Sequence, residues 1–283
     1  MLVQLDHVKK EYEDFALELD MQIPENRVTG LIGANGAGKS TAFKLMLGLI
    51  RPDYGTVNVL DRKASDLTVM EKEKIGTVFS DSGFSEYLTV QQVIHIMKKF
   101  YTDFNENLFQ KQCEKLEIPL KKQIKEFSTG MKAKLKVILA ISHDSKLLIL
   151  DEPTAGLDVI AREEILNLLR DYMDTPGRSI VISSHISGDL EHFCDDVYMI
   201  HNGKIVLHEE TDRILDEYGF IKVPEQEFAK LDKEYILRIK KENFGYSCLT
   251  DQKNYYLENY PGIVIEKGSV DEVITMMVKG ESI

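Results

Sequence analysis

The sequence predicts an α/β fold in which helices pack on a mixed sheet. Short apolar runs, typical of buried parallel strands, lie at 28–32, 74–79, 147–150 and 180–182. Patterns typical of helices separate these runs along the chain. A glycine-rich loop lies between the first run and the first predicted helix at 40–50. Strands that alternate with helices in this way indicate an α/β domain over about residues 1–215.

Two further segments predict antiparallel strands. Residues 15–23 alternate apolar with polar side chains, and this period of two is typical of a half-buried strand. A turn follows at Pro24-Glu25-Asn26, where asparagine tolerates the left-handed conformation. Residues 198–207 have Asn202-Gly203 near their middle, which is typical of a hairpin. We therefore expect the fold to include an antiparallel β subdomain.

A helical subdomain is expected over about residues 82–142. Thr89 begins a capping-box pattern that ends at Gln92. The helix that follows has apolar side chains on one face, namely Val93, Ile96, Met97 and Phe100. A second helix is predicted over roughly 105–116.

The pattern changes after Gly219, and we divide the chain there into a domain over 1–219 and an accessory domain over 220–283. The second part combines a helical segment at 225–231 with alternating or apolar segments at 235–239 and 263–265. Ser269 begins another capping-box pattern, which opens a last helix. These features predict a small C-terminal α+β appendage.

Composition and charge argue against several classes of protein. The 283 residues carry a net charge of −12, which disfavours nucleic acid as a partner because phosphate-binding surfaces are usually basic. The widely spaced Cys113, Cys194 and Cys248 predict reduced thiols rather than a disulfide framework. The first residues lack the pattern of a signal peptide, and no stretch approaches about 18 uninterrupted apolar residues. Any role at a membrane would therefore come through a partner.

The glycine-rich loop matches the phosphate-binding pattern G-x-x-x-x-G-K-[ST] at residues 33–40. Glycines let backbone N–H groups approach phosphate oxygens, and the helix after the loop directs its positive end at them. Lys39 would neutralise the β and γ phosphates of ATP, and the Ser40 hydroxyl would bind Mg²⁺. A chance match is expected in roughly 1% of chains of this length. We therefore predict a P-loop NTPase core in which these residues bind MgATP: Gly33, Asn35, Gly36, Ala37, Gly38, Lys39, Ser40 and Thr41.

Two acidic residues, Asp151 and Glu152, follow the apolar run at 147–150. The carboxyl end of a parallel strand opens onto the same crevice as the phosphate loop. There Asp151 would hold Mg²⁺ through water, and Glu152 would be the catalytic base that polarises the attacking water. Alone, such a pair is usually structural, but beside a phosphate loop the catalytic interpretation is favoured. His185 follows another apolar run, and it either packs as an ordinary histidine or bonds the γ-phosphate and orients Glu152.

One further motif resembles a known family. Ser128, Thr129 and Gly130 form a Ser-x-Gly turn that opens a helix about twenty residues before the Asp-Glu pair. This turn, the segment Asp151-Glu152-Pro153-Thr154-Ala155-Gly156-Leu157-Asp158 and His185 resemble, in order and spacing, the motifs of ATP-binding cassette (ABC) proteins. The resemblance covers about residues 2–215 and is especially close to cassettes of bacterial ABC-2-type exporters, including those linked to antimicrobial peptides.

The resemblance implies a mechanism that uses two cassettes. They would face each other head to tail and enclose two ATP molecules. Ser128 and the amides near Gly130 would bind the γ-phosphate held by Lys39 of the other cassette, and Asp158 would couple the two sites. Tyr12 stands where the family stacks an aromatic ring on adenine, and Phe15 is the alternative for that role.

The chain departs from the family pattern in two motifs. Thr129 and Met131 vary the usual Leu-Ser-Gly-Gly-Gln signature. Ser80 stands where the family has a glutamine that senses Mg²⁺ and the partner. The Ser80 hydroxyl, or the neighbouring Asp81 carboxylate, offers oxygen to the metal but has a shorter reach.

The resemblance also implies a function. The chain would be the ATP-hydrolysing subunit of an exporter that moves a peptide or drug-like substrate through a separate integral membrane subunit. It would lie in the cytoplasm, peripheral at the inner face of the cell membrane, beside a second cassette that is identical or a paralogue. Phe84, Tyr87 and Leu88 would contact the membrane subunit, unless they pack within the helical region. The alternatives are soluble cassettes in translation, DNA repair or iron–sulfur assembly.

Overall fold

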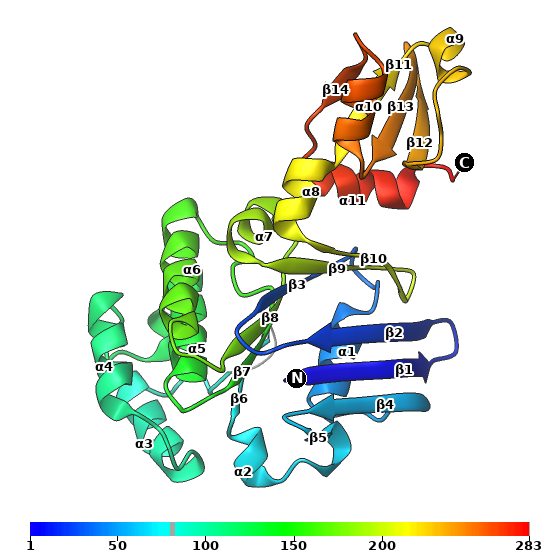
Figure 1. Cartoon of the computed structure of the whole chain (residues 1–283). Helices are drawn as coiled ribbons and strands as arrows, with labels where there is room; N and C mark the ends of the chain where they lie inside the picture. Colours follow the sequence, from blue (N-terminus) through cyan, green and yellow to red (C-terminus); the bar gives the residue numbers. More distant parts are fainter. Residues whose placement is uncertain (80–82, 283) are drawn as a thin grey trace.

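The computed structural model describes residues 1–79 and 83–282. Figure 1 shows a larger body built around a mixed sheet and a smaller C-terminal body beyond β10. The strands are β1 (Val3–Glu11), β2 (Ala16–Ile23), β3 (Val28–Ile32), β4 (Tyr54–Val59), β5 (Arg62–Lys63), β6 (Ile75–Val78), β7 (Leu147–Asp151), β8 (Ser179–Ser183), β9 (Asp196–His201), β10 (Lys204–Glu210), β11 (Gly219–Val223), β12 (Ile236–Glu242), β13 (Gly245–Thr250) and β14 (Val264–Glu266). The helices are α1 (Lys39–Met46), α2 (Val69–Lys72), α3 (Val90–Phe100), α4 (Glu106–Lys115), α5 (Thr129–Ile141), α6 (Val159–Met173), α7 (Ser187–Phe193), α8 (Thr211–Glu217), α9 (Glu225–Phe228), α10 (Lys253–Asn259) and α11 (Val270–Lys279), with short 3-10 turns at Ala64–Asp66 and Ile124–Glu126.

The larger body contains a ten-stranded sheet in the order β5-β4-β1-β2-β10-β9-β3-β8-β7-β6. Strands β6, β7, β8, β3 and β9 pair in parallel. Their side chains alternate between a core shared with α1 and a core shared with α5 and α6. Because helices cover both faces, β3 and β8 are buried along their whole length. The four apolar runs that predicted parallel strands are therefore confirmed.

Antiparallel strands occupy the other half of this sheet. Strand β1 pairs with both β2 and β4, and β2 buries every second residue, as its alternating sequence predicts. Strands β9 and β10 form the predicted hairpin, whose turn residues Asn202 and Gly203 have φ angles of 47° and 77°. Strand β10 pairs with β2 where Lys204 lies opposite Glu18. The mixed sheet and the antiparallel subdomain thus agree with the predicted fold class.

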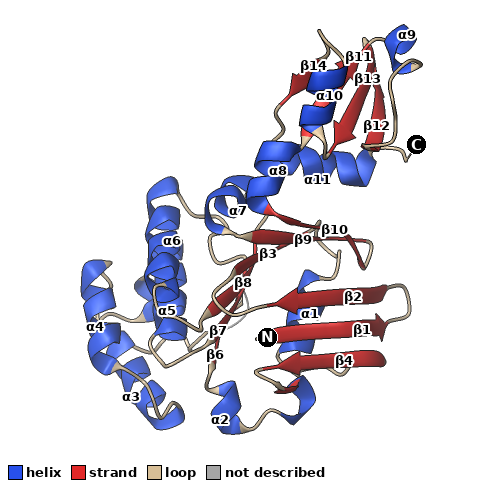
Figure 2. Ribbon diagram, viewed as in Figure 1, coloured by secondary structure: helices blue, strands red, loops and turns tan. Residues whose placement is uncertain are grey.

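Helices α3, α4 and α5 form the helical subdomain beside the sheet (Figure 2). The predicted capping box of Thr89 and Gln92 is present at the start of α3, and Asn105 caps α4. The predicted apolar face is partly wrong. Phe100 is 71% exposed, and the buried residues of α3 are Val90, Val93, Ile94 and Met97. Phe100 lies at the end of the helix, where the core no longer covers it.

Two predicted helices are shorter than expected. Helix α1 ends at Met46 instead of residue 50. Gly48 causes this end, because its φ is 65° and a Cβ there would lie 2.1 Å from the carbonyl oxygen of Ala64. Helix α9 ends at Phe228 instead of residue 231. The other helical predictions agree with the structure in place and type.

The C-terminal strands form a separate antiparallel sheet in the order β12-β13-β11-β14. With α9 after β11 and α10 after β13, the chain follows a β-α-β-β-α-β path. One face of the sheet packs around the buried Cys248 and around Tyr256 of α10. This sheet begins at Gly219, next to the proposed domain division.

Helix α11 joins the C-terminal part to the larger body, as Figure 1 shows. Its buried Val270 and Val273 belong to the same core as Leu190 of α7 and Ile214 of α8. The C-terminal part is therefore packed on the larger body and is not held by the connecting chain alone.

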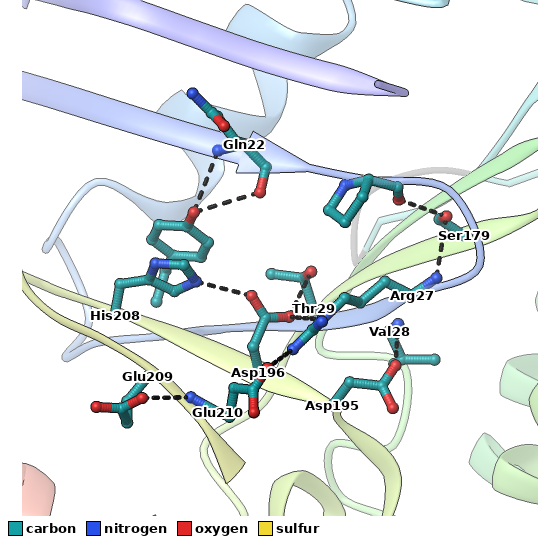
Figure 3. A network of polar contacts seen from close by, with 12 residues as sticks. Gln22, Arg27, Val28, Thr29, Ser179, Asp195, Asp196, His208, Glu209 and Glu210 are labelled. Carbon is teal, nitrogen blue, oxygen red and sulfur yellow. Dashed lines mark hydrogen bonds and ion pairs between the residues drawn. The ribbon is translucent and has the colours of Figure 1, made fainter. Parts of the chain in front are cut away.

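A polar network ties β2 and β10 to the start of β3 and β9 (Figure 3). The carboxylate of buried Asp196 accepts a hydrogen bond from the Thr29 hydroxyl at 2.8 Å. It also lies 2.8 Å from Nε2 of His208 and 3.5 Å from Nε of Arg27. The His208 ring stacks on Tyr198, whose hydroxyl bonds the backbone of β2. Within this network the guanidinium of Arg27 lies near the carboxylates of both Asp196 and Glu210.

The cysteines agree with the prediction of reduced thiols. Cys113, Cys194 and Cys248 are free and buried. Burial raises the pKa of the Cys113 and Cys248 thiols to about 12. Across residues 1–79 and 83–282, no helix has the length and apolar character needed to cross a membrane.

Candidate nucleotide-binding site

The loop between β3 and α1 requires glycine at three positions of its motif. Gly36 and Gly38 have φ angles of 81° and 119°, in the region that favours glycine. A Cβ at Gly38 would also lie 2.4 Å from a side-chain carbon of Leu17. One at Gly33 would lie 2.4 Å from the carbonyl oxygen of Ile200. Packing against β2 and β9 therefore requires glycine at positions 38 and 33, and the backbone conformation favours it at position 36.

Positive charge gathers at the start of α1. Gly38 occupies the N-cap position of α1, and no side chain among the described residues caps this helix start. The first N–H groups of α1 are therefore available to bind a ligand. The buried Lys39 donates from Nζ to the carbonyl oxygens of Gly33 at 2.6 Å and of Ala34 at 3.4 Å. A lysine ammonium beside a helix N-terminus is an anion-binding arrangement.

The predicted metal ligands Ser40 and Asp151 lie side by side. Ser40 Oγ donates to Oδ2 of Asp151 at 3.1 Å. Strands β7 and β8 place Asp151 opposite Ser183, whose hydroxyl donates to Oδ1 at 2.7 Å. Hydroxyl and carboxylate oxygens are the ligands that Mg²⁺ prefers, so this pair fits a hard divalent cation.

Glu152 and His185 form a second pair beside the first. Oε2 of Glu152 lies 2.6 Å from Nδ1 of His185 and accepts the His185 backbone N–H at 3.3 Å. Glu152 has a φ of 52°, and its own N–H donates to the Ser183 hydroxyl at 2.9 Å. A residue with a side chain rarely adopts this φ, and such strain is typical of functional sites.

Lys39, Ser40, Asp151 and Glu152 share one cavity of about 390 Å³, whereas His185 is not in its lining. Its lining comprises Tyr12, Phe15, Ala34, Asn35, Gly36, Gly38, Lys39, Ser40, Thr41, Asp151 and Glu152. Gly33 and Ala37 are not in this lining, and Ala37 is buried. The structure thus brings the phosphate loop and both carboxylates to one place.

The two aromatic candidates for adenine stacking occupy different positions in this cavity. The Phe15 ring packs against the loop, 3.2 Å from where a Cβ of Gly38 would lie. Tyr12 is 48% exposed, and its ring centroid is 6.3 Å from that of Phe15. Tyr12 therefore has the freer ring, while Phe15 supports the loop.

Ser128, Gly130 and Asp158 lie away from this cavity, at the starts of two neighbouring helices. The Ser128 side chain caps α5, and the Asp158 carboxylate caps α6 by accepting the Ala161 N–H at 2.9 Å. A Cβ at Gly130 would lie 3.4 Å from that of Ala161, so the two helix starts adjoin. The three residues of the signature and coupling motifs are thus together, but apart from the phosphate loop of their own chain.

Ser80 and Asp81, the departure from the family pattern, lie outside the described residues. The structure gives no geometry for the predicted metal contact of Ser80. The described neighbour Phe79 accepts a hydrogen bond at its carbonyl oxygen from Nζ of Lys136, at 2.9 Å. Lys136 and the acidic pair Asp151 and Glu152 line a further cavity of about 520 Å³.

An apolar groove of about 390 Å³ lies between α2 and α3. Its lining is Val69, Lys72, Glu73, Phe84, Ile96, Met97, Phe100 and Tyr101. Three residues were predicted to contact the membrane subunit. Phe84 lines the groove. Phe84 and Leu88 are partly buried and pack against the core of the helical subdomain. Tyr87 is 72% exposed, with Nζ of Lys125 5.1 Å from its ring centroid. The groove and the Tyr87 ring are therefore two exposed apolar features of this subdomain.

Sequence reasoning missed Ser183. Its hydroxyl bonds the Asp151 side chain and the Glu152 backbone, and so fixes both acidic residues. The signal was a pair of serines at the end of an apolar run, directly before His185. Only the pairing of β8 with β7 shows that the first serine faces the acidic pair.

Comparisons with known proteins agree with this geometry. Residues 17–155 match the family model described as ABC transporter. The bacitracin transport ATP-binding protein BcrA of Enterococcus faecalis is 31% identical over 209 residues, which cover 72% of this chain and 68% of that protein. The lantibiotic transport ATP-binding protein SrtF of Streptococcus pyogenes is 32% identical over 215 residues, or 75% of this chain and 92% of that protein.

A solved structure of an ATP-binding subunit of an ABC transporter has the same fold. It superposes with a TM-score of 0.68 at 26% identity, over 76% of this chain and 92% of that one. The predicted P-loop NTPase fold and the predicted family are therefore both confirmed. This chain belongs to the ABC transporter family, in which it is an ATP-binding subunit with ATPase activity.

Proposed function

We propose that this chain powers the export of a peptide or drug-like substrate through a separate membrane subunit, from the inner face of the cell membrane. The observation that carries the proposal is the convergence of Lys39, Ser40, Asp151 and Glu152 on one cavity. The names of the relatives support a role in transport, because BcrA is named for the transport of bacitracin and SrtF for the transport of a lantibiotic.

In this site Lys39 and the N–H groups of α1 hold the phosphates of ATP. Ser40, and Asp151 through water, would hold Mg²⁺, which would supply positive charge beside the β and γ phosphates. Ser183 keeps Asp151 in position for that role. Tyr12 stacks on the adenine, with Phe15 beneath the loop.

Glu152 acts as the general base. Its carboxylate orients the attacking water and polarises it, and its contact with His185 keeps that carboxylate turned into the site. His185 then lies near the γ-phosphate, where its ring bonds a phosphate oxygen. The strained backbone of Glu152 is consistent with a residue held for chemistry.

A second cassette completes the site. Ser128 and Gly130 stand at the N-terminus of α5, which suits a phosphate, yet they lie away from their own chain's loop. They bind the γ-phosphate of the other cassette, while Asp158 contacts that cassette and couples the sites. Next to Asp158, Val159 and Ile160 are 74% and 75% exposed, which suits a surface that a partner covers.

The apolar groove between α2 and α3 is the proposed contact with the membrane subunit. Exposed Val69 and Phe100 border it, and an amphipathic helix that lies in such a groove buries its apolar face. Tyr87 extends this surface. A charge at Tyr87 would lose its contact with water on docking, which costs several kcal/mol.

The test is co-purification of the tagged chain from detergent-solubilised native cells. We expect a polytopic membrane protein to accompany the wild-type chain and to be lost with Tyr87→Glu. Tyr54→Glu is the matched control, because Tyr54 is a similarly exposed tyrosine on β4, at 65%. Both variants should bind ATP normally. A chain that emerges without a membrane protein would contradict the exporter proposal and favour a soluble cassette.

A further inference from the structure

Helix α7 lies between the nucleotide site and the C-terminal domain, which here means residues 219–282. It begins two residues after His185. Its other side packs on α8 and α11, which stand beside it in Figures 1 and 2. A single short helix therefore adjoins both the loop of His185 and the domain to which no function has been assigned.

Asp189 fixes α7 to the catalytic segment. Its carboxylate is buried, accepts a hydrogen bond from the Thr154 hydroxyl at 2.7 Å and lies 3.8 Å from Nε of Arg162. Thr154 follows Glu152 by two residues. A buried hydrogen bond to a charged group is strong, so α7 and the segment after Glu152 are held as one piece.

Leu190 fixes α7 to the strand that carries the phosphate loop. A Cβ at Gly30 of β3 would lie 3.1 Å from Cδ2 of Leu190, and Leu190 is 1% exposed. The helix thus rests directly on the backbone of β3. Its position is set by close packing, and close-packed interfaces transmit a displacement instead of absorbing it.

Glu191 connects α7 to the C-terminal domain. Its Oε1 accepts the backbone N–H of Val270, the first residue of α11, at 2.8 Å. This N–H is one of the donors that a helix start leaves without an intrahelical partner. Val270 is 1% exposed, so water has little access to replace the carboxylate. Ser269 and Glu272 cap the same helix start from within the C-terminal domain.

We propose that Glu191 is a positioning residue through which the C-terminal domain holds α7, and with it the loop of His185, in place beside Glu152. The inference rests on the proposed role of His185. The domain then acts on hydrolysis and not on nucleotide binding, because α7 directly follows the loop of His185 and bonds the segment after Glu152, whereas it meets β3 at Gly30, before the phosphate loop begins at Gly33.

The test compares variants of the full-length chain by steady-state ATPase kinetics. Glu191→Ala should lower kcat about fivefold and leave KM for ATP within about twofold, because positioning of the catalytic group is lost while the phosphate loop is intact. Glu191→Gln keeps an acceptor oxygen for the Val270 N–H and should restore most of kcat. Hydrogen exchange should rise at the α7 amides in Glu191→Ala alone.

Ser269→Ala is the matched control. It removes a cap from the same start of α11 but leaves the contact with α7, so kcat should stay at the wild-type value. A wild-type kcat for Glu191→Ala, or an equal loss for Ser269→Ala, would overturn the inference. The His185→Ala variant distinguishes the proposed role of His185 in hydrolysis from the proposed link through α7. If His185→Ala turns over ATP normally, the proposed role of His185 fails; if it is inactive and Glu191→Ala is normal, only the link through α7 fails.

Discussion

Two cavities of this molecule are lined by basic and acidic side chains, but the basic side chain is paired with carboxylates in only one of them. The nucleotide site, about 390 Å³, holds Lys39, Asp151 and Glu152. The cavity beside the network of Figure 3, about 560 Å³, holds Arg27, Asp196 and His208 with further carboxylates. They lie at opposite ends of β3, since the network bonds Thr29 and the phosphate loop follows Ile32.

The partners distinguish the two cavities. Arg27 lies 2.9 Å from Glu210 and 3.5 Å from Asp196, so its charge is neutralised within the protein. Lys39 bonds two neutral carbonyl oxygens, and among the described residues no carboxylate is within ion-pair distance of it. Its charge is therefore available to a phosphate. The larger of these two cavities thus has its arginine charge paired within the protein, and the smaller has a lysine charge that is free for a ligand.

The largest expected effect is on hydrolysis. Glu152→Gln should lower phosphate release about 10³-fold, because a general base is lost, while ATP affinity stays unchanged. With MgATP it should also run as a dimer on gel filtration. Asp196→Asn, its counterpart in the other cavity, should lower Tm and leave turnover alone. A Glu152→Gln variant that keeps its turnover would show that this carboxylate is not the base; an ATP-bound monomer would require a paralogous partner cassette.

The next effect separates binding from stability. Lys39→Ala should weaken ATP binding about 100-fold with little change in Tm, because the lost charge is unpaired in the free protein. Arg27→Ala should do the reverse and destabilise the fold by roughly 2–3 kcal/mol, since Asp196 stays buried with less compensation. Titration calorimetry and thermal unfolding of both variants check this. Equal effects of the two substitutions on ATP affinity would show that Lys39 and Arg27 do not differ in the availability of their charge.

The smallest effect tests the two aromatic rings within the nucleotide site. Tyr12→Ala should weaken ATP about tenfold, as expected for one lost stacking contact, and leave the affinity for tripolyphosphate unchanged. Phe15→Ala should instead lower Tm, because its ring supports the loop at Gly38. If Phe15→Ala alone shows the adenine-dependent loss, Phe15 is the stacking residue.

Local chemistry made much of this molecule predictable. The buried strands, the alternation of β2 and the turn at Asn202-Gly203 depend on residues near one another in sequence. The motif at 33–40 is equally local, since one turn of backbone presents its N–H groups. The end of α1 was not predictable, because the contact of Gly48 with the distant Ala64 decides it. The exposure of Phe100 depends on where the core ends beside α3.

The sequence by itself determined the fold class, the phosphate loop, the acidic pair and the capping residues, since each rests on short-range geometry. The tertiary structure alone decided which residues support these groups. Ser183 reaches Asp151 because β8 pairs with β7, and Glu191 meets Val270 across 79 residues of chain because α7 packs on α11. It also decided that Arg27 is neutralised and Lys39 is not. Such partners come from segments far apart in the chain, so only long-range packing reveals them.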